Sequence, residues 1–361
     1  MGNMTMQKQN AQSGFTLVEL MVSMAIGLIV MAAMASLFKT GMNSTMLLQQ
    51  RAETQQNMRA AVDLMVKDLG LAGAGLPSGG IQLPTGAGAS ASKFGCDQTG
   101  TCHVVNDTYP NGNYMYGIIP GYLNGVEGGA AIPAAPAPAV NDSVTVAYCD
   151  YNFPLWEYTV AFTGASGGGI TVTPIASYSP APPALNAVGG IQAGDLILLS
   201  NSLGTAIGEV STTPAATALT FGNLDALNIN QSGAATNNIK AISGGANTVA
   251  YRLFVVTYYL SVPGGFQTPR LMRQVNGLTP APVADDIINL QIAYDTYNTT
   301  TDALDANQAN PLGLAESPNN IQKINLVVMG QSIINNGNKS QNMFLATSVS
   351  ARNMAFRNRY D

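Results

Sequence analysis

The N-terminal part of the chain carries two hydrophobic patterns, and both predict helix. Phe15 to Phe38 is apolar apart from one acid, Glu19, and Leu20 to Phe38 is a run of 19 uncharged residues. A helix needs ~20 apolar residues to cross the hydrocarbon core of a bilayer. Further along, good helix formers dominate, and apolar residues from Met58 to Leu69 recur at the spacing of one helical face.

The two patterns join into one predicted helix, because no proline occurs before Pro77. This helix runs from Phe15 to Leu69 and would be roughly 80 Å long at 1.5 Å per residue. Its first half is apolar all round, and its second half has one apolar face. The charged residues that lie off this face are Arg59, Asp63, Lys67 and Asp68. We expect the second half to dock on a globular head, in preference to a coiled-coil stalk, because its heptads are irregular.

Glycines mark where the helix could bend and where it should end. Gly27 and Gly41 are weak points within it. Before Pro77 the residues that favour termination are Gly70, Gly73 and Gly75. The following region, 70–138, contains two stretches rich in Gly, Ala and Pro, 79–90 and 121–138, which we interpret as ordered surface loops.

The rest of the chain reads as short strands punctuated by Gly, Pro or Asn. The predicted strands are Ser143–Cys149, Trp156–Phe162, Ile170–Pro174, Asp195–Ser200, Thr205–Val210, Ala250–Val262, Arg270–Val275, Ile321–Gly330 and Met343–Ala351. Asp286–Asp295 fits either helix or strand. The strands do not alternate with helices of 10–15 residues, so we expect an α+β protein: a long N-terminal helix on a β-rich, mainly antiparallel head.

The composition argues against several classes of function. Charged residues are 10% of the chain, with 15 basic and 20 acidic side chains, so the chain lacks the basic surface that nucleic acids require. Hydrophobic residues are 46%, enough to build a core rather than a disordered chain. The sequence has one histidine, His103. A single histidine argues against a zinc site with several histidines and against catalysis by a His-containing triad.

Two general interpretations of the apolar N-terminus leave Glu19 unexplained. A plain transmembrane anchor fits the length, but an acid inside the bilayer is unfavourable and is usually functional. A secretory signal peptide would use Leu20 to Ala32 as its apolar core and Ala33-Met34-Ala35 as its cleavage site. Against it stand the weak basic region before the core and the acid at its start.

A third interpretation explains the acid. The order Ser13-Gly14-Phe15-Thr16-Leu17-Val18-Glu19-Leu20 resembles the processing motif of type IV prepilins. The resemblance implies cleavage after Gly14 by prepilin peptidase, N-methylation of Phe15 by the same enzyme, and a role for Glu19 in filament assembly. Glu19 lies one helical turn from the new amine, so the two charges could pair within one chain or between neighbours.

The resemblance also implies an organisation and a location. Residues 1–14 would be the leader, 15–38 the membrane-spanning and assembly half of the helix, 39–70 its amphipathic half and 71–361 a periplasmic head. The protein would be a single-pass protein of the bacterial inner membrane that enters a pilus after processing. Its partners would be prepilin peptidase and other minor and major pilins. No cofactor, metal or enzymatic activity is implied.

Later blocks of sequence narrow the resemblance to large minor pilins of the PilW type. In order, these blocks are Tyr251-Arg252-Leu253 to Tyr258-Tyr259-Leu260, Pro269 to Gly277, Asp286 to Tyr294, and Ser348 to Asn353. This resemblance implies a place in the initiating or tip complex of a type IV pilus. Two alternatives stay open: a minor pseudopilin of a type II secretion system, and a secreted hydrolase or binding protein.

Cysteines and several short motifs complete the candidates. We expect a disulfide between Cys96 and Cys102, which share one polar loop, and a buried thiol at Cys149, which is also a possible alternative partner. A Cys₃His metal site with His103 is disfavoured, because Cys102 and His103 are adjacent.

Other patterns fit ordinary structure better than chemistry. Gly164 to Gly168 matches G-x-S-x-G but lies between two predicted strands, so we expect a hairpin loop. A calcium loop built from Asp302, Asp305 and Asn307 would want more acids. Asp285-Asp286 suits the start of a turn or helix, and Trp156 with the tyrosine pairs suits core or edge packing.

Overall fold

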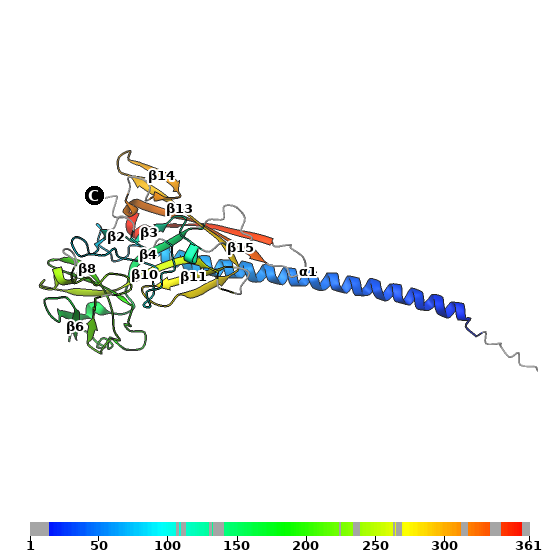
Figure 1. The fold of residues 1–361 in the computed structure, drawn as a ribbon, viewed down its shortest axis with the longest axis horizontal. Coiled ribbons are helices and arrows are strands. Elements are labelled where there is room, and N and C mark those ends of the chain that lie inside the picture. The colour runs from blue at the N-terminus through cyan, green and yellow to red at the C-terminus, as the bar shows by residue number, and fades with distance from the viewer. Residues whose placement is uncertain are drawn as a thin grey trace, which may run out of the picture. The chain divides into compact units, whose positions relative to one another are not determined.

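The computed structural model describes residues 14–105, 108–109, 113–129, 132, 141–223, 225–233, 239–262, 264, 269–311, 317–332 and 341–355. The chain divides into two compact units, Met1–Glu53 and Thr54–Asp361. Helix α1 (Leu17–Leu71) belongs to both. Its first part makes up the described portion of the first unit, and its last part belongs to the head (Figure 1).

The predicted long helix is confirmed, with both ends shifted by two residues from the predicted Phe15 and Leu69. The helix passes Gly70 and ends at Leu71, after which Gly73 adopts a φ of +78° that favours glycine. Gly73 N–H donates to the carbonyl of Ala147 at 2.8 Å, and the Cys149 N–H donates to the carbonyl of Ala74 at 2.8 Å. The end of the helix is therefore hydrogen-bonded to a central strand of the head.

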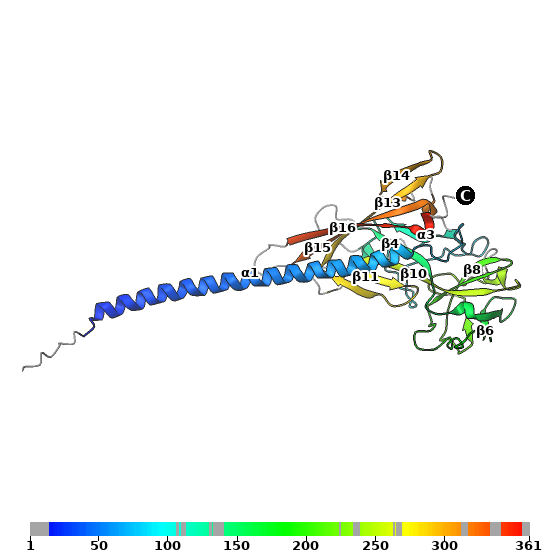
Figure 2. The ribbon, with the colours of Figure 1, turned by 180° about the vertical axis from the view of Figure 1, so that it is seen from behind.

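The head is built from antiparallel sheets, as the sequence predicts (Figures 1 and 2). The largest sheet has seven strands. Its order is β12 (Ala281–Asp285), β11 (Arg270–Val275), β10 (Val249–Ser261), β4 (Ser143–Asp150) and β3 (Ile118–Gly121), with β7 (Leu196–Asn201) beside β10 and β8 (Gly204–Glu209) beside β7.

Three smaller sheets complete the head. The four-stranded sheet has the order β14 (Ala303–Gln308), β13 (Ile287–Asn298), β15 (Ile321–Ser332) and β16 (Gln341–Ser350). The three-stranded sheet contains β5 (Tyr158–Phe162), β6 (Gly169–Pro174) and β9 (Ala218–Thr220). β1 (Ile81–Gln82) pairs with β2 (Tyr114–Met115). Among the described residues, the short helices are α2 (Ile239–Ile242), α3 (Arg352–Ala355) and the 3-10 turns Glu127–Gly129, Leu155–Glu157 and Pro318–Asn320.

The nine predicted strands all occur, with boundaries that agree within two residues. Trp156, which was predicted to begin a strand, belongs to the 3-10 turn that precedes β5. The ambiguous segment Asp286–Asp295 is strand β13, which starts after a positive φ at Asp286. The prediction missed six strands of two to six residues: β1, β2, β3, β9, β12 and β14. Of these, β3, β12 and β14 carry proline or acids instead of an apolar alternation.

The head-side part of α1 packs into the main core, as its one-sided pattern predicts. The helix residues buried there are Met58, Ala61, Val62, Met65 and Leu69. Their neighbours come from both large sheets: alternate residues of β4 and β10, such as Val146 and Tyr258, together with residues of β13 and β15 such as Leu290 and Leu326. Both large sheets therefore share one hydrophobic core with the helix.

The central strands of the seven-stranded sheet are buried on both faces, because the intervening residues of β4 and β10 enter a second core. Ala147 and Val255 pack there against side chains from the segment after the helix, including Leu83 and Phe94. The expectation that 79–90 is only a surface loop is wrong, because this stretch contains β1 and buried apolar side chains. Of the other predicted surface loop, 121–138, residues 130, 131 and 133–138 lie outside the described residues.

Asp68 corrects the sequence analysis, because this charged residue lies on the buried face of α1. Its side chain is 3% exposed. It accepts hydrogen bonds from Tyr148 Oη at 2.9 Å, Tyr258 Oη at 2.6 Å and Arg273 Nε at 2.8 Å. Burial and the Asp68 carboxylate raise the pKa of both tyrosines, so their hydroxyls stay protonated and donate.

Arg273 on β11 supplies the countercharge of Asp68. Burial opposes its charge, but the hydrogen bond and the charge of Asp68 raise the pKa of Arg273, so the guanidinium stays ionised. A buried carboxylate is stable only when it is paired and hydrogen-bonded. The spacing Ala61, Met65, Asp68 follows a helical face, which is the signal that could have placed Asp68 inside.

Replacing Asp68 should weaken the head. Asp68→Ala leaves Arg273 without its carboxylate, and we expect a loss of about 3 kcal/mol, at the low end for a broken buried pair because Arg273 is partly solvated. The measurement is denaturant unfolding of the full chain in detergent, followed by tyrosine absorbance. Asp63→Ala, on the exposed face of the same helix, is the matched control. Equal midpoints for the two variants would contradict this role of Asp68.

A second buried acid makes the stability of the head depend on pH. Glu209, at the end of β8, is 2% exposed. Burial and the neighbouring Asp225 raise the pKa of Glu209 to about 9. The folded chain therefore keeps a proton that the unfolded chain releases near pH 4.5. Because the native state binds more protons in this window, the Glu209 contribution makes the free energy of unfolding fall as pH rises from about 4.5 to 9.

Glu209→Gln should remove this pH dependence. We compare the free energy of unfolding of the variant with that of the unmodified chain. The difference, variant minus unmodified, should increase by up to about 1.4 kcal/mol per pH unit between pH 6 and 8.5. The measurement is denaturant unfolding of both proteins across this range. Glu53→Gln, at an exposed helical position, should give a difference that does not change with pH. A flat difference for Glu209→Gln as well would mean that Glu209 is ionised in the native state.

Candidate functional site

The N-terminal motif forms a hydrogen-bonded cap on the first turn of α1. The Thr16 N–H donates to Glu19 Oε2 at 3.0 Å, and the Thr16 hydroxyl lies 3.1 Å from the same oxygen. In return, the Glu19 N–H donates to Thr16 Oγ1 at 3.3 Å. This reciprocal arrangement is a capping box, which satisfies backbone donors that a helix start leaves open.

The cap fixes where the acid lies. Glu19 stands in the first helical turn, where a negative charge is favourable. Both side-chain contacts with Thr16 end on Oε2, so the second carboxylate oxygen, Oε1, can accept from another donor. Sequence reasoning singled out Glu19 but missed Thr16, although the spacing T-x-x-E is a known sign of a capping box.

The residues before the cap are open to solvent. Phe15 is 90% exposed, and a side chain at Gly14 would meet no atom within 4 Å. The peptide bond between these two residues is therefore not shielded by the described part of the chain. Such a bond is accessible to a protease without unfolding of the helix.

The first part of the helix that follows, up to Met46, exposes its large apolar residues. The most exposed of the large ones include Leu17, Leu28, Ile29, Leu37 and Phe38. Among the described residues, α1 is the one helix long and apolar enough to cross a membrane, and none of its most apolar window is buried within the chain. An exposed apolar surface of this length fits the interior of a bilayer or of a helical bundle.

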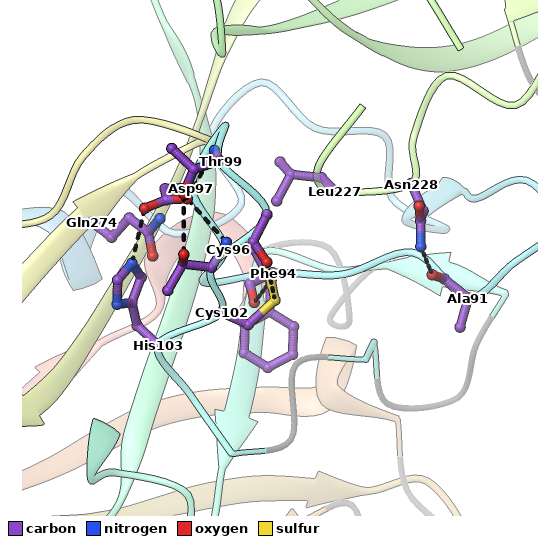
Figure 3. The surroundings of a disulfide bond; sticks show 12 residues. Ala91, Phe94, Cys96, Asp97, Thr99, Cys102, His103, Leu227, Asn228 and Gln274 are labelled. Carbon is purple, nitrogen blue, oxygen red and sulfur yellow. Dashed lines mark hydrogen bonds and ion pairs between the residues drawn. A yellow bond between two sulfur atoms is a disulfide. The ribbon is translucent and has the colours of Figure 1, made fainter. Parts of the chain in front are cut away.

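A second cluster surrounds the loop of the cysteines (Figure 3). Cys96 and Cys102 are joined in a disulfide, and Cys149 is a buried thiol outside it. Inside the loop, Asp97 Oδ1 accepts from the N–H groups of Thr99 and Thr101. Burial opposes ionisation of Asp97, but these hydrogen bonds lower its pKa, so the carboxylate organises the loop.

His103 follows the disulfide and connects the loop to two neighbouring segments. Its Nδ1 lies 2.6 Å from Glu127 Oε1, its Nε2 lies 3.5 Å from Asp97 Oδ2, and its ring stacks on Tyr259 at 5.6 Å. Ser261 donates to Glu127 and not to His103, so the group lacks the serine–histidine contact of a hydrolase. The disulfide occupies two of the three thiols that a Cys₃His metal site would need.

The remaining short motifs have structural roles in the head. Gly164–Gly168 lies between antiparallel β5 and β6, which confirms the predicted hairpin loop. The polar cluster of the β13–β14 hairpin is divided among separate partners: Asp302 accepts from Tyr297, Asp305 from Asn298, and Asn307 from Asn325. Trp156 contacts the rings of Tyr151 and Tyr251.

Comparison with known proteins identifies the N-terminal motif. Residues 9–35 match the prokaryotic N-terminal methylation motif. This match covers Gly14, Phe15, Thr16 and Glu19 together with much of the apolar run. No curated protein and no solved structure matches the chain at a significant level.

The motif and the exposed apolar helix support a membrane-anchored protein of the type IV pilin-like or pseudopilin-like class. A motif of this class implies processing by prepilin peptidase and association with other pilins. It favours a structural role over an enzymatic one.

The disulfide can be tested by counting thiols. Protein that is unfolded and alkylated without reduction should carry one label, on Cys149, and reduction before alkylation should expose two more. The small loop between Cys96 and Cys102 predicts stabilisation near the lower end of ~2–4 kcal/mol. The measurement is intact mass and peptide mapping of material isolated with thiol blocking. Three labels without reduction would show that the disulfide does not form in the native protein.

Proposed function

We propose that the chain is a minor pilin of a type IV pilus. In this proposal residues 1–14 are a leader that prepilin peptidase removes between Gly14 and Phe15, and Phe15 becomes N-methylated. Residues 15–38 anchor the protein in the inner membrane and later pack among the helices of other pilins. Residues 39–70 complete the helix, and 71–361 form a periplasmic head.

The observation that carries the proposal is the capped acid at the start of an exposed apolar helix. The Thr16 N–H is a peptide group before and after cleavage, so the capping box survives processing. The new amine of Phe15 then lies next to the cap, and Glu19 Oε1 is the available acceptor. A carboxylate and an amine are each unfavourable in a bilayer, and pairing Glu19 with the amine of a neighbouring subunit would make assembly relieve both costs.

Two further observations favour a minor pilin of the PilW type near the pilus tip. A head of this size fits poorly along a crowded shaft, which favours low copy number. In addition, the sequence blocks similar to PilW-type proteins fall on β10, β11, β13 and the end of β16, and these strands surround the buried face of α1. The resemblance therefore lies in the part of the head that holds the helix.

A minor pseudopilin of a type II secretion system has the same architecture and is the alternative within the class. The identity of neighbouring genes, for a pilus or for secretion, separates the two. A secreted protein released by signal peptidase is the alternative from a different class. In that case the mature chain would begin at Ser36.

Processing is tested first. Gly14→Val should block cleavage. Gly14 has no side chain, so its backbone can enter a narrow peptidase site that a β-branched side chain would obstruct. The variant should keep Lys8 and the rest of the leader, whereas the unmodified chain should begin with methylated Phe15. The measurement is intact-mass and N-terminal analysis of membrane-extracted protein. A mature N-terminus at Ser36 would contradict the proposal.

The role of Glu19 is tested by separating insertion from assembly. Glu19→Ala should enter the membrane at least as well as the unmodified chain, because it removes a charge from the bilayer. Its recovery with partner pilins should fall, because a neighbouring amine loses its carboxylate. Glu19→Gln should behave in the same way, since it keeps the size and loses the charge.

Thr16→Val completes this test, because it removes the hydroxyl of the cap and keeps the carboxylate. It should reduce assembly less than Glu19→Ala does. The measurement is the amount of each variant in the membrane fraction and in sheared pili. Normal recovery of Glu19→Ala in pili would show that Glu19 is not the assembly residue.

A further inference from the structure

The four-stranded sheet of the head has two edges with opposite character. One edge, β14, is six residues long, carries Asp305 and pairs with β13 through an irregular register. The other edge, β16, is ten residues long and pairs with β15 in unbroken register from Gln341 to Ser350. Natural edge strands are usually short, charged, bulged or interrupted by proline, because a regular edge invites another strand. β14 follows this rule and β16 does not.

Two edges of the seven-stranded sheet also follow the rule. β12 contains Pro282 and Asp285 and has a register shift against β11. β3 is four residues long and contains Pro120. Among the described strands that form a sheet edge, β16 is the longest, and its sequence, QNMFLATSVS, has no charge, glycine or proline. Within the described chain, its one strand neighbour is β15.

The side chains of β16 indicate which side chains a matching strand would carry. On the outer face Phe344 is 75% exposed, and Val327 of β15 is 37% exposed and lies opposite Ala346. On the inner face Met343 and Leu345 are half-buried at the rim of the main core. Polar residues stand at both ends of this apolar centre. A matching strand would therefore be uncharged and apolar on both faces at its centre.

We propose that the outer edge of β16 from Met343 to Ser350, which no described strand covers, binds an extended, uncharged segment of a different protein chain, which adds a fifth strand to this sheet. The added strand would pair its backbone with β16 and place apolar side chains beside Phe344 on one face and beside Met343 and Leu345 on the other. This mode of recognition draws affinity from main-chain hydrogen bonds and specificity from alternate side chains.

The direction of β16 argues against the β16 strand of a second copy of this chain as the occupant. A side chain at Gly330 would meet Thr54 and Met58 of α1, and Gly330 pairs with Met343, whereas Gly70 lies against Val349. β16 therefore runs in the same direction as the head-side part of α1 (Figure 2).

Both twofold arrangements of two β16 strands then fail. An antiparallel pair would point the two helices in opposite directions, which two chains anchored in one membrane cannot do. A parallel pair related by a twofold axis along the strands would place each donor opposite the same donor of the other copy. A strand from a different chain has neither restriction.

The proposal is tested by photo-crosslinking the full-length protein in its native cells. Benzoylphenylalanine at position 344 should give a discrete adduct with one other chain, and the same probe at position 304, on the exposed part of β14, should not. The cross-linked peptide should be an uncharged segment with an apolar centre. In the presence of the probe at 344, Ala346→Lys should reduce the adduct at least about tenfold, because a charge on the edge opposes strand addition.

Ala306→Lys provides the matched control, since it makes the same change at an exposed residue of β14 and should leave the adduct unchanged. Ser348→Lys, at another exposed residue of β16, should cause the same loss of adduct. Each lysine variant should unfold at the same temperature as the unmodified chain, which would show that its fold is kept. An adduct of twice the chain's own mass, equal adducts from 344 and 304, no adduct from 344, or an adduct insensitive to Ala346→Lys would each overturn the proposal.

The partner's identity tests the proposed function separately. A partner that itself carries a methylation motif would agree with a role in pilus assembly. A partner without one would keep the edge as a binding site and count against that role.

Discussion

The buried face of α1 between Thr54 and Leu71 is the interaction on which the rest of the head depends. It supplies apolar side chains to a core that the seven-stranded and four-stranded sheets share. Asp68 lies within this face and has its hydrogen-bonding partners, Tyr148, Tyr258 and Arg273, on three strands of the larger sheet. Burial of apolar side chains provides the driving force for docking the helix. The Asp68–Arg273 pair selects one rotation and one depth of the helix, because any other position would leave a buried charge without its partner.

The same helix has to satisfy two different environments. Its first part exposes apolar residues on every side, and its head-side part has one apolar face. Glu19, the single acid of the apolar run 15–38, is placed at the helix start, where Thr16 and the backbone already favour it. Asp68, the buried acid of the head-side part, is placed where Arg273, Tyr148 and Tyr258 contact it. In both places a carboxylate is tolerated because specific donors surround it, and the donors differ with the environment.

The sequence predicted those features that depend on periodicity and end signals. A run of apolar residues, a one-sided stripe and a glycine cluster located α1, and β-branched alternation located nine strands. It failed where the environment comes from distant residues. Asp68 looks like a solvated charge until Arg273 and Tyr258 are known to face it, and β3 and β14 become strands because β4 and β13 offer them hydrogen bonds. At the candidate site, Glu19 was evident as an anomaly in an apolar run, whereas Thr16 is an ordinary residue whose role appears only in the geometry of the cap.

The junction between the helix and β4 has a mechanical consequence. Hydrogen bonds from Gly73 to Ala147 and from Cys149 to Ala74 attach the end of α1 to a strand in the interior of the largest sheet. A pulling force applied along the helix therefore reaches the head at two places, the apolar face of the helix and these backbone bonds. Neither can yield alone, because the helix cannot slide past β4 without breaking both bonds and extracting Asp68. Load is thus shared between side chains and backbone.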